Sequence, residues 1–538
     1  MQPLDFSTVI QTLTQNAQNV WMPHFFPEVV VCVTIVLILL ASICLKRTAR
    51  TTFALALIGL LVALCGIGSQ LNVVGSGVSA NPGEYFGGVL IWDGFTVPVR
   101  GMLLLFAILA LSLSGSTMKF GARDATDFYT LLLGSTLGLL VLAQSNNLLM
   151  AFVGFEMASI PGYALVGFQR HRLRSSEASL KYLLYGAAAS GVMLYGISLL
   201  SGLTGTLSVS QLGSHVAAIG SQATGATASH AVIFSLLLIF VGFAFKLSLV
   251  PFHFWAPDAF EGASAEVAGF LSVGGKVATF SLLVRMSLAL SGSMTGEAAK
   301  LVLPLGIGLG VVAMASVTFG NLAAYFQKNV KRLLAYSTIA HSGYMLMAVA
   351  ALLVLRSPEG ASSGIDVKQV TQQCIEGLVF YLFVYVFMNI GAFGLTALMR
   401  NHFGSEDLEG VKGFGRVFPI HGACLVVCVF SLVGLPPLGG FWGKFVVFYS
   451  LFMASKISTF MMVVLLVGGL NTVFSLFYYI GILKAVFLGE PREGSSSLVA
   501  ASSENGLAML IALPILLLGM FPGAATDFAS EMARSLVR

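Results

Sequence analysis

Apolar stretches of about 20 residues recur along the chain, and short polar segments separate them. An α-helix needs about this length to cross the ~30 Å hydrocarbon core of a bilayer, whereas a membrane β-strand shows about ten residues of alternating polarity. The pattern therefore predicts an all-α polytopic membrane protein. We expect about fourteen transmembrane spans, near residues 26–45, 52–70, 96–117, 128–145, 148–168, 178–201, 230–250, 264–289, 301–324, 333–355, 376–399, 418–452, 459–486 and 504–525.

Two of the expected spans contain sequences that interrupt an α-helix. The seventh includes SLVPFHFWAPD (248–258) and the twelfth includes SLVGLPPLGGFWGKF (431–445). If spans 4–8 and 9–13 form two five-helix repeats, the seventh and twelfth spans occupy the same position in each repeat. Because five is an odd number, the second repeat is inverted in the membrane relative to the first. Broken helices and inverted repeats are typical of ion transporters. The chain is predicted to consist of a three-helix segment (1–125), the first repeat (126–290), the second repeat (300–488) and a C-terminal helix (500–538).

Composition agrees with a membrane protein and excludes other classes. Apolar residues make up 57% of the 538 residues and charged residues 9%, against roughly a quarter charged in a soluble domain. The net charge of +5 is spread over many loops without a dense basic tract, which argues against a nucleic-acid partner. Residues 1–45 contain no Lys or Arg, so we expect a retained first span and no cleavable signal peptide.

The distribution of basic residues predicts orientation, because short cytoplasmic loops carry an excess of Lys and Arg. If the first loop is cytoplasmic, alternation puts seventeen of the 28 basic residues on that side: Lys46, Arg47, Arg50, Lys119, Arg123, Arg170, Arg172, Arg174, Lys181, Lys328, Lys331, Arg332, Arg400, Lys412, Arg416, Lys484 and Arg492. Eight fall on the other side: Arg100, Arg285, Lys300, Arg356, Lys368, Lys456, Arg534 and Arg538. Both termini are therefore expected to face outward, away from the cytoplasm.

The cysteines do not suggest a redox or metal centre. They form no CxxC motif and no spacing typical of haem or iron–sulfur ligation. We expect them to be buried small hydrophobic residues. The six are Cys32, Cys44, Cys65, Cys374, Cys424 and Cys428.

The remaining basic residues, Lys246, Lys276 and Lys444, are expected inside spans, and Glu156 is the single charged residue of the fifth span. A Lys at the bilayer centre costs about 2.5–3.5 kcal/mol, and such residues usually mark ion pathways. Two other interpretations stay open. A Lys near a helix end can extend to the interface, and a buried Glu–Lys pair can serve only to set helix register.

Three further residues are candidates for proton transfer. His253 follows Lys246 by seven residues, just past the break, and His341 lies in HSGYML of the tenth span. An imidazole can relay protons, although a histidine in such a loop often only anchors a hydrogen bond. Lys181 follows Glu177 by four residues at a helix start, a spacing that also fits an ordinary ion pair on one helix face.

Several long motifs are similar to one known family. They are FKLSLVPFHFWAPDAFEGASAEVAGFLSVGGKVATF, SSEASLKYLLYGAAASGVMLYG, NLAAYFQKNVKRLLAYSTIAHSGYML and GLPPLGGFWGKF. Over about residues 90–490 the chain resembles the subunit N family of bacterial NADH:quinone oxidoreductase (respiratory complex I), to which mitochondrial subunit 2 is also similar. Relatives in multi-subunit sodium/proton antiporters usually have a His-bearing eighth helix where this chain has GGKVATF.

The resemblance implies an antiporter-like, proton-pumping subunit with a polar axis of Glu on helix 5 and Lys on helices 7, 8 and 12. Those places are occupied by Glu156, Lys246, Lys276 and Lys444. Lys181 and His253 match further positions of the family's proton path. The implied partners are other membrane-arm subunits, including neighbouring antiporter-like subunits, in the bacterial inner (plasma) membrane. No cofactor is expected in this chain, while quinone, FMN and iron–sulfur clusters are expected in partner subunits.

The mechanism that follows is electrostatic. Burial and an ionised Glu156 act in opposite senses on whether Lys246 holds a proton, so a change at Glu156 switches Lys246. Lys276 would pass the proton on, and Lys444 would exchange it with the outer side. Two other classes stay open: a subunit of a cation/proton antiporter or of a ferredoxin-linked complex, and a structural subunit whose polar axis is vestigial.

Overall fold

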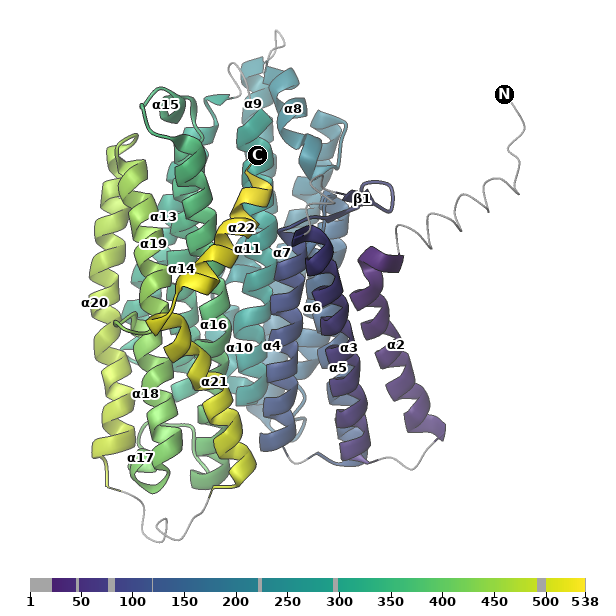
Figure 1. Ribbon diagram of the computed structural model, residues 1–538, viewed down its shortest axis with the longest axis vertical. Coiled ribbons are helices and arrows are strands. Elements are labelled where there is room, and N and C mark those ends of the chain that lie inside the picture. Colours follow the sequence, from purple (N-terminus) through teal and green to yellow (C-terminus); the bar gives the residue numbers. More distant parts are fainter. Residues whose placement is uncertain are drawn as a thin grey trace.

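The structure is a computed structural model that describes residues 22–44, 48–75, 83–118, 120–220, 225–293, 299–490 and 500–537. Figure 1 shows an upright bundle of long helices, most of them running between its upper end, which carries α8 and α15, and its lower end, which carries α17. Part of the topology prediction rests on residues outside the described ranges, namely Lys46, Arg47, Lys119, Arg492 and Arg538.

Thirteen helices in the described part of the chain are long and apolar enough to cross a membrane. The bundle is nearly all-helical, which confirms the predicted fold class. The helices are α2 (Met22–Cys44), α3 (Ala49–Gly75), α4 (Thr96–Thr117), α5 (Ala122–Ala143), α6 (Leu148–Val166), α7 (Leu173–Thr204), α9 (Gly225–Leu247), α11 (Ala265–Ser293), α13 (Val302–Ala324), α14 (Val330–Leu355), α16 (Val367–Phe403), α20 (Thr459–Leu488) and α21 (Ser502–Met520).

The predicted twelfth span is present as two shorter helices, α18 (Pro419–Val433) and α19 (Gly439–Ser455). Gly434 ends α18 in the left-handed conformation (φ 89°), which glycine adopts at little cost. The seventh span is likewise divided into α9, a turn at 248–254 and α10 (Trp255–Gly262). Pro251 and Pro436 lie in the two interruptions, where a missing backbone N–H stops a helical ladder. Trp255 Nε1 donates to the Phe245 carbonyl at 2.9 Å and so satisfies one acceptor near the end of α9.

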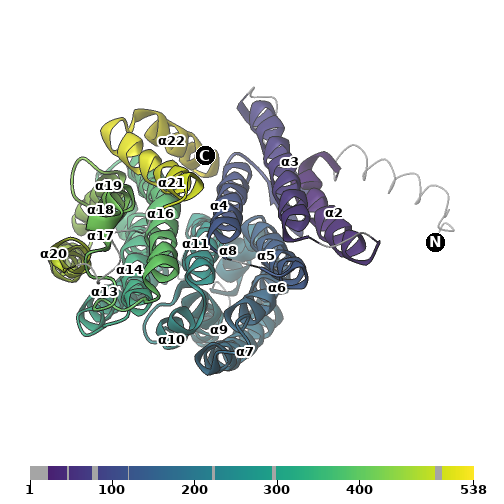
Figure 2. The same cartoon turned by 90° about the horizontal axis from the view of Figure 1, so that it is seen from below.

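The innermost helices are α11, α14 and α16, and Figure 2 shows them surrounded by the others. Nearly every residue of α14 is buried. The outer helices carry exposed apolar side chains, for example Leu184 on α7 and Leu470 on α20, both 59% exposed. A surface helix of a soluble protein is polar on its outer face, so these faces are suited to lipid.

The ten helices assigned to the two predicted repeats lie in two neighbouring groups (Figure 2). The first group contains α5, α6, α7, α9 with α10, and α11, and the second contains α13, α14, α16, α18 with α19, and α20. Their inverted relationship and the segment boundaries stay predictions.

Several short elements were not expected from the apolar pattern. A two-stranded antiparallel hairpin pairs β1 (Gly83–Tyr85) with β2 (Leu90–Trp92). The segment between the sixth and seventh expected spans contains α8 (Val209–Gly220), and α22 (Gly523–Leu536) crosses the bundle obliquely after α21 (Figure 1). The other additions are single turns, α15 (Pro358–Ala361) and α17 (Phe414–Val417).

Candidate functional site

Four charged residues expected inside spans lie on four different helices. Glu156 is on α6, Lys246 is in the last turn of α9, Lys276 is in the middle of α11, and Lys444 is in α19 just after the second interruption. The three lysines are buried, with 8%, 1% and 4% of their surface exposed, and Glu156 is half-buried. Their burial makes the snorkelling interpretation untenable for the lysines, including Lys444.

Lys246 forms a hydrogen bond with the helix that carries Glu156. Its ammonium donates to Ser159 Oγ at 2.8 Å. Ser159 lies three residues after Glu156 on α6, and residues at this spacing are neighbours on one helix face. The Glu156 carboxylate accepts a hydrogen bond from Ser190 of α7 and also has a Coulomb interaction with the Lys246 ammonium. Glu156 and Lys246 therefore face the same small polar region between α6, α7 and α9.

Lys246 also touches the helix that carries Lys276. Its Cε would lie 3.2 Å from a Cβ built on Gly275 of α11, so the absence of a side chain at Gly275 leaves room for the lysine stem. Lys276 is the next residue along α11. The side chain of Lys246 thus bridges α6 and α11 and lies between Glu156 and Lys276.

Buried polar groups extend the row from α11 to α16. Lys276 Nζ donates to the Ser272 carbonyl at 3.0 Å, one turn earlier on its own helix. Asn389 of α16 donates to Ser272 Oγ at 2.7 Å and to the Tyr385 hydroxyl at 2.9 Å. Ser272 and Asn389 are fully buried, and this polar link joins the two groups of helices.

His341 of α14 occupies the region between Lys276 and Lys444. Its Nδ1 is 2.7 Å from the Tyr381 hydroxyl and its Nε2 is 3.3 Å from the Tyr479 hydroxyl. Its ring centroid lies 5.4 Å from that of Tyr385, and the ammonium groups of Lys276 and Lys444 both interact electrostatically with the imidazole. His341 is therefore surrounded by tyrosine hydroxyls and flanked by two cations.

Lys444 is held at the second interruption. Its ammonium donates to the carbonyls of Leu432 and Val433, at 3.0 and 2.8 Å, which are the last residues of α18. The same ammonium lies 4.5 Å from the centre of the Tyr344 ring, within cation–π range. Carbonyls left free at a helix end carry partial negative charge and stabilise a cation there.

The structure thus places five predicted residues, Glu156, Lys246, Lys276, His341 and Lys444, in one row that crosses the bundle, and all but the half-buried Glu156 are buried. The residues that link them were not singled out from the sequence. A serine or tyrosine in an apolar helix is too common to signal a site. Asn389 could have been found, because an amide in the middle of a span needs a partner on another helix. The linking residues are Ser159, Ser190, Ser272, Asn389, Tyr344, Tyr381, Tyr385 and Tyr479.

His253 lies in the turn between α9 and α10 and is 3% exposed. Its ring packs on Phe254 and Phe319, with centroids 4.3 and 4.4 Å away. Nδ1 of His253 has no hydrogen-bond partner in the described part of the chain. This buried nitrogen lies seven residues beyond Lys246 along the chain.

Lys181 lies outside the buried row. Its side chain is 42% exposed and forms ion pairs with Glu177 at 2.8 Å and with Asp258 of α10 at 2.9 Å. Asp258 also pairs with Arg332 of α14 at 2.7 Å. The i,i+4 pair with Glu177 is therefore present, and Lys181 belongs to an ion-pair cluster that joins α7, α10 and α14.

Three further basic residues are buried, although the prediction of orientation from basic residues had assigned them to loops or to the ends of spans. Arg100 of α4 pairs with Glu28 at 3.0 Å, and both side chains are 0% exposed. Arg285 of α11 pairs with Asp93 at 2.7 Å, and Lys331 of α14 is 1% exposed and pairs with Glu406 at 2.8 Å. The count of loop charges therefore did not distinguish these three buried, paired residues from basic residues exposed in loops. Sequence position alone does not show whether a charge at a span end has a buried partner.

Within the described ranges, no group of three or more His, Cys, Asp or Glu residues is placed to hold a metal ion. All six cysteines are free thiols. Cys374, Cys424 and Cys428 are buried, whereas the expectation of burial was wrong for Cys32, Cys44 and Cys65 on the outer helices α2 and α3.

A family profile described as NADH:quinone oxidoreductase/Mrp antiporter, TM, matches residues 145–357 and 364–471. This match spans more than half of the chain and includes every candidate site residue. The chain belongs to this family. Relatives named NADH-quinone oxidoreductase subunit N match over nearly their full length. One from Chlorobium chlorochromatii is 34% identical over 98% of this chain and 97% of that protein, and one from Rhodospirillum rubrum is 32% identical over 96% and 98%.

Solved structures agree with this assignment. A chain of respiratory complex I from Thermus thermophilus with bound aureothin has a TM-score of 0.70 and 29% identity, covering 93% of this chain and 98% of that chain. A chain of the Mrp complex from Dietzia has a TM-score of 0.76 but 19% identity, covering 96% and 97%, and shows the fold alone. The resemblance drawn from the motifs is confirmed: the chain is an antiporter-like membrane subunit of the NADH:quinone oxidoreductase family.

Proposed function

We propose that the chain moves protons through the row formed by Glu156, Lys246, Lys276, His341 and Lys444. Quinone reduction in partner subunits of NADH:quinone oxidoreductase supplies the free energy. The observation that carries the proposal is the position of Lys246, whose side chain bonds to the helix of Glu156 and lies against the helix of Lys276. A residue placed only to set helix register needs one partner, whereas Lys246 contacts the helices of both its neighbours in the row.

Lys246 is the switch in this proposal. Burial disfavours its charged form, and an ionised Glu156 favours that form, so movement or protonation of Glu156 changes the proton affinity of the amine. The position at the end of α9 supports the charged form, because the last carbonyls of a helix carry partial negative charge. Ser159 can accept from the ammonium or donate to the neutral amine, since a hydroxyl does both.

Lys276 receives the proton and His341 relays it toward Lys444. The amide of Asn389 cannot itself carry a proton, so its hydrogen bonds orient Ser272 and Tyr385 beside the path. Lys444 holds the proton at the carbonyls of Leu432 and Val433 before releasing it. The chain thereby uses both helix interruptions as places where a buried amine can be charged.

Lys181 and His253 are proposed to supply protons from the lower end of the bundle. Lys181 lies in the ion-pair cluster with Asp258, and α10 leads from Asp258 back to the turn that contains His253. The free Nδ1 of His253 gives the last acceptor before Lys246. In this arrangement the cluster at α7, α10 and α14 is the entrance, and the row of buried lysines is the path.

We further propose that the chain resides in the bacterial inner membrane with both termini outward and that it holds no redox cofactor. The split of basic residues supports the orientation. Single cysteines placed in the 170–172 loop and at Ser535 should be labelled by a membrane-impermeant maleimide from opposite sides of the membrane. Labelling of both from one side would overturn the orientation.

The experiment that tests the function compares Glu156→Gln and Lys246→Ala in the assembled complex. Both should lower the proton gradient formed per quinone reduced in inside-out vesicles, because each removes one member of the coupled pair. Lys456→Ala is the matched control, since Lys456 is an exposed lysine at the end of α19 and should leave pumping unchanged. Normal pumping by both site variants, with assembly verified, would refute the proposal.

A further inference from the structure

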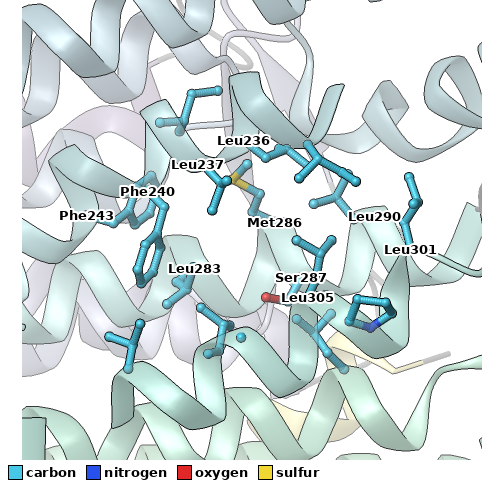
Figure 3. A pocket seen from close by; sticks show the side chains of 17 residues that line it. Leu236, Leu237, Phe240, Phe243, Leu283, Met286, Ser287, Leu290, Leu301 and Leu305 are labelled. Atoms are coloured by element: carbon cyan, nitrogen blue, oxygen red, sulfur yellow. The ribbon is translucent and has the colours of Figure 1, made fainter. Parts of the chain in front are cut away.

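A membrane-depth groove lies between the two groups of helices, away from the buried row of lysines. Its walls are α9 and α13, and its floor is α11 with Leu353 of α14. The cavity has a volume of about 260 Å³. Figure 3 shows the labelled side chains of the three lining helices around one continuous space, with the hydroxyl of Ser287 as the side-chain oxygen among them.

The groove has the length of one leaflet of a bilayer. Its lining extends from Ile233 to Phe243 on α9 and from Leu301 to Val312 on α13. From the first to the last of these residues there are ten or eleven steps, and at 1.5 Å a step the helix rises about 15–17 Å. Half of the ~30 Å hydrocarbon core is about 15 Å, which is the depth that one acyl chain occupies.

The groove is open on the side away from α11. Leu237 on the α9 wall is 55% exposed, and Pro304 and Gly308 on the α13 wall are also exposed. The floor residues Leu283, Met286 and Leu290 are buried, each 6% exposed. A chain molecule can therefore enter from the side and be covered on three sides by apolar atoms.

A cation lies just beyond one end of the groove. Leu290 and Leu353 line this upper end, and Arg356 follows Leu353 by three residues. Arg356 Nε donates to Ser291 Oγ at 2.8 Å, directly beyond Leu290, and the guanidinium forms no ion pair with a carboxylate within the described ranges. Burial holds the pKa of Arg356 below its usual range because the charge has lost water. A guanidinium in this state is suited to an anionic oxygen ligand.

We propose that this groove binds one phospholipid, with an acyl chain between α9 and α13 and its phosphate at Arg356. A purely apolar ligand would leave the guanidinium unused, and a soluble anion would leave the groove empty. The lipid fills the gap between the two groups of helices in the leaflet at the α8 and α15 end. The inference is independent of the proton path.

Gly308→Trp tests the acyl-chain part of the proposal. A Cβ at Gly308 meets no atom within 4 Å, so the new side chain extends into the groove without a clash at its base. The complex is purified in detergent, and the phospholipid retained per complex is measured by mass spectrometry. We expect one lipid fewer in Gly308→Trp than in the wild type. The control is Leu470→Trp on the lipid-facing side of α20, which should retain the wild-type number.

Arg356→Gln tests the headgroup part. After removal of lipid, the complex is incubated with phosphatidylglycerol or phosphatidylcholine. The variant should lose about tenfold in retention of the phospholipids, as expected for one charge-assisted hydrogen bond, while Lys456→Gln should not. Unchanged retention of both lipids would overturn the assignment of the phosphate to Arg356.

Photo-crosslinking distinguishes a lipid from a protein partner and does not depend on the tryptophan variant folding. Benzoylphenylalanine at position 237 should form an adduct with a phospholipid that survives in the purified complex. The same probe at position 470 gives the background from ordinary surrounding lipid. An adduct to another subunit at position 237, or lipid labelling no higher than at position 470, would overturn the proposal.

Discussion

The buried pair of Arg100 and Glu28 makes a quantitative prediction about how the N-terminal helices are attached to the bundle. The guanidinium donates to both carboxylate oxygens of Glu28, at 3.0 and 3.1 Å, and to the side chain of Gln70 at 2.5 Å. Gln144 at the end of α5 also donates to Glu28 at 3.1 Å. This network joins α2, α3, α4 and α5 with two charges that are 0% exposed.

Arg100→Met leaves the Glu28 carboxylate buried without a cation. Breaking a buried pair in this way costs about 3–5 kcal/mol, whereas replacing both partners by apolar residues is often nearly neutral. We therefore expect the opening free energy of α2 to fall by about 3–5 kcal/mol in Arg100→Met. It should recover to within about 1 kcal/mol of the wild type in the double variant Glu28→Met/Arg100→Met.

Hydrogen exchange of peptides from residues 22–44, measured on the assembled complex, gives this free energy. At about 1.4 kcal/mol per tenfold, exchange in the single variant should be faster by between about a hundredfold and a few thousandfold. Leu37→Met, on the exposed face of the same helix, is the control and should change the rate little. If the double variant exchanges as fast as the single variant, the cost does not come from a stranded charge and the reasoning is refuted.

Two further predictions follow from contacts near the site and at the upper end of the bundle. Gly138→Val should prevent assembly of the complex, because a Cβ at this position would lie 2.3 Å from the backbone nitrogen of Ala158 on α6. The control is Gly191→Val, where a Cβ meets nothing within 4 Å, and this variant should assemble. Native electrophoresis measures assembly of both variants. Burial by itself raises the pKa of the Asp93 carboxyl, but the Arg285 guanidinium and the N–H groups of Thr96 and Phe95 more than offset this and hold the pKa below its usual range. The pair therefore stabilises the fold fully above the unfolded pKa of about 3.9, and this stabilisation is lost as the pH falls through the lower folded pKa. Asp93→Asn should lower the melting temperature at neutral pH and flatten its acid dependence below pH 4, and an unchanged acid profile would contradict this.

The sequence predicted the long helices well because length and hydropathy determine whether a segment can span a bilayer. The span expected at 96–117 is α4, with the same ends. The eleventh span was expected too short, since α16 begins at Val367 with polar residues such as Gln369 and Gln372 that no hydropathy pattern marks as helical. The β1–β2 hairpin was missed because three-residue strands are too short to show a period.

The charged members of the site were predictable and their connections were not. Lys246, Lys276, Lys444 and Glu156 stand out because a charge within an apolar run is costly. The bridges depend on which helices pack together, and Ser159 becomes a partner of Lys246 only because α9 packs near α6. The pairing of Arg100 with Glu28 likewise joins residues 72 positions apart, which a sequence pattern cannot reveal.

Lys246→Arg tests the central claim most directly, because arginine keeps the positive charge and cannot release a proton in the working pH range. The measurement is the number of protons moved per quinone reduced, in vesicles that contain the assembled variant complex. If Lys246 is the proton switch, Lys246→Arg should pump nearly as poorly as Lys246→Ala. If the lysine serves only to hold helices in register through its charge, Lys246→Arg should pump like the wild type, and that result would contradict the account.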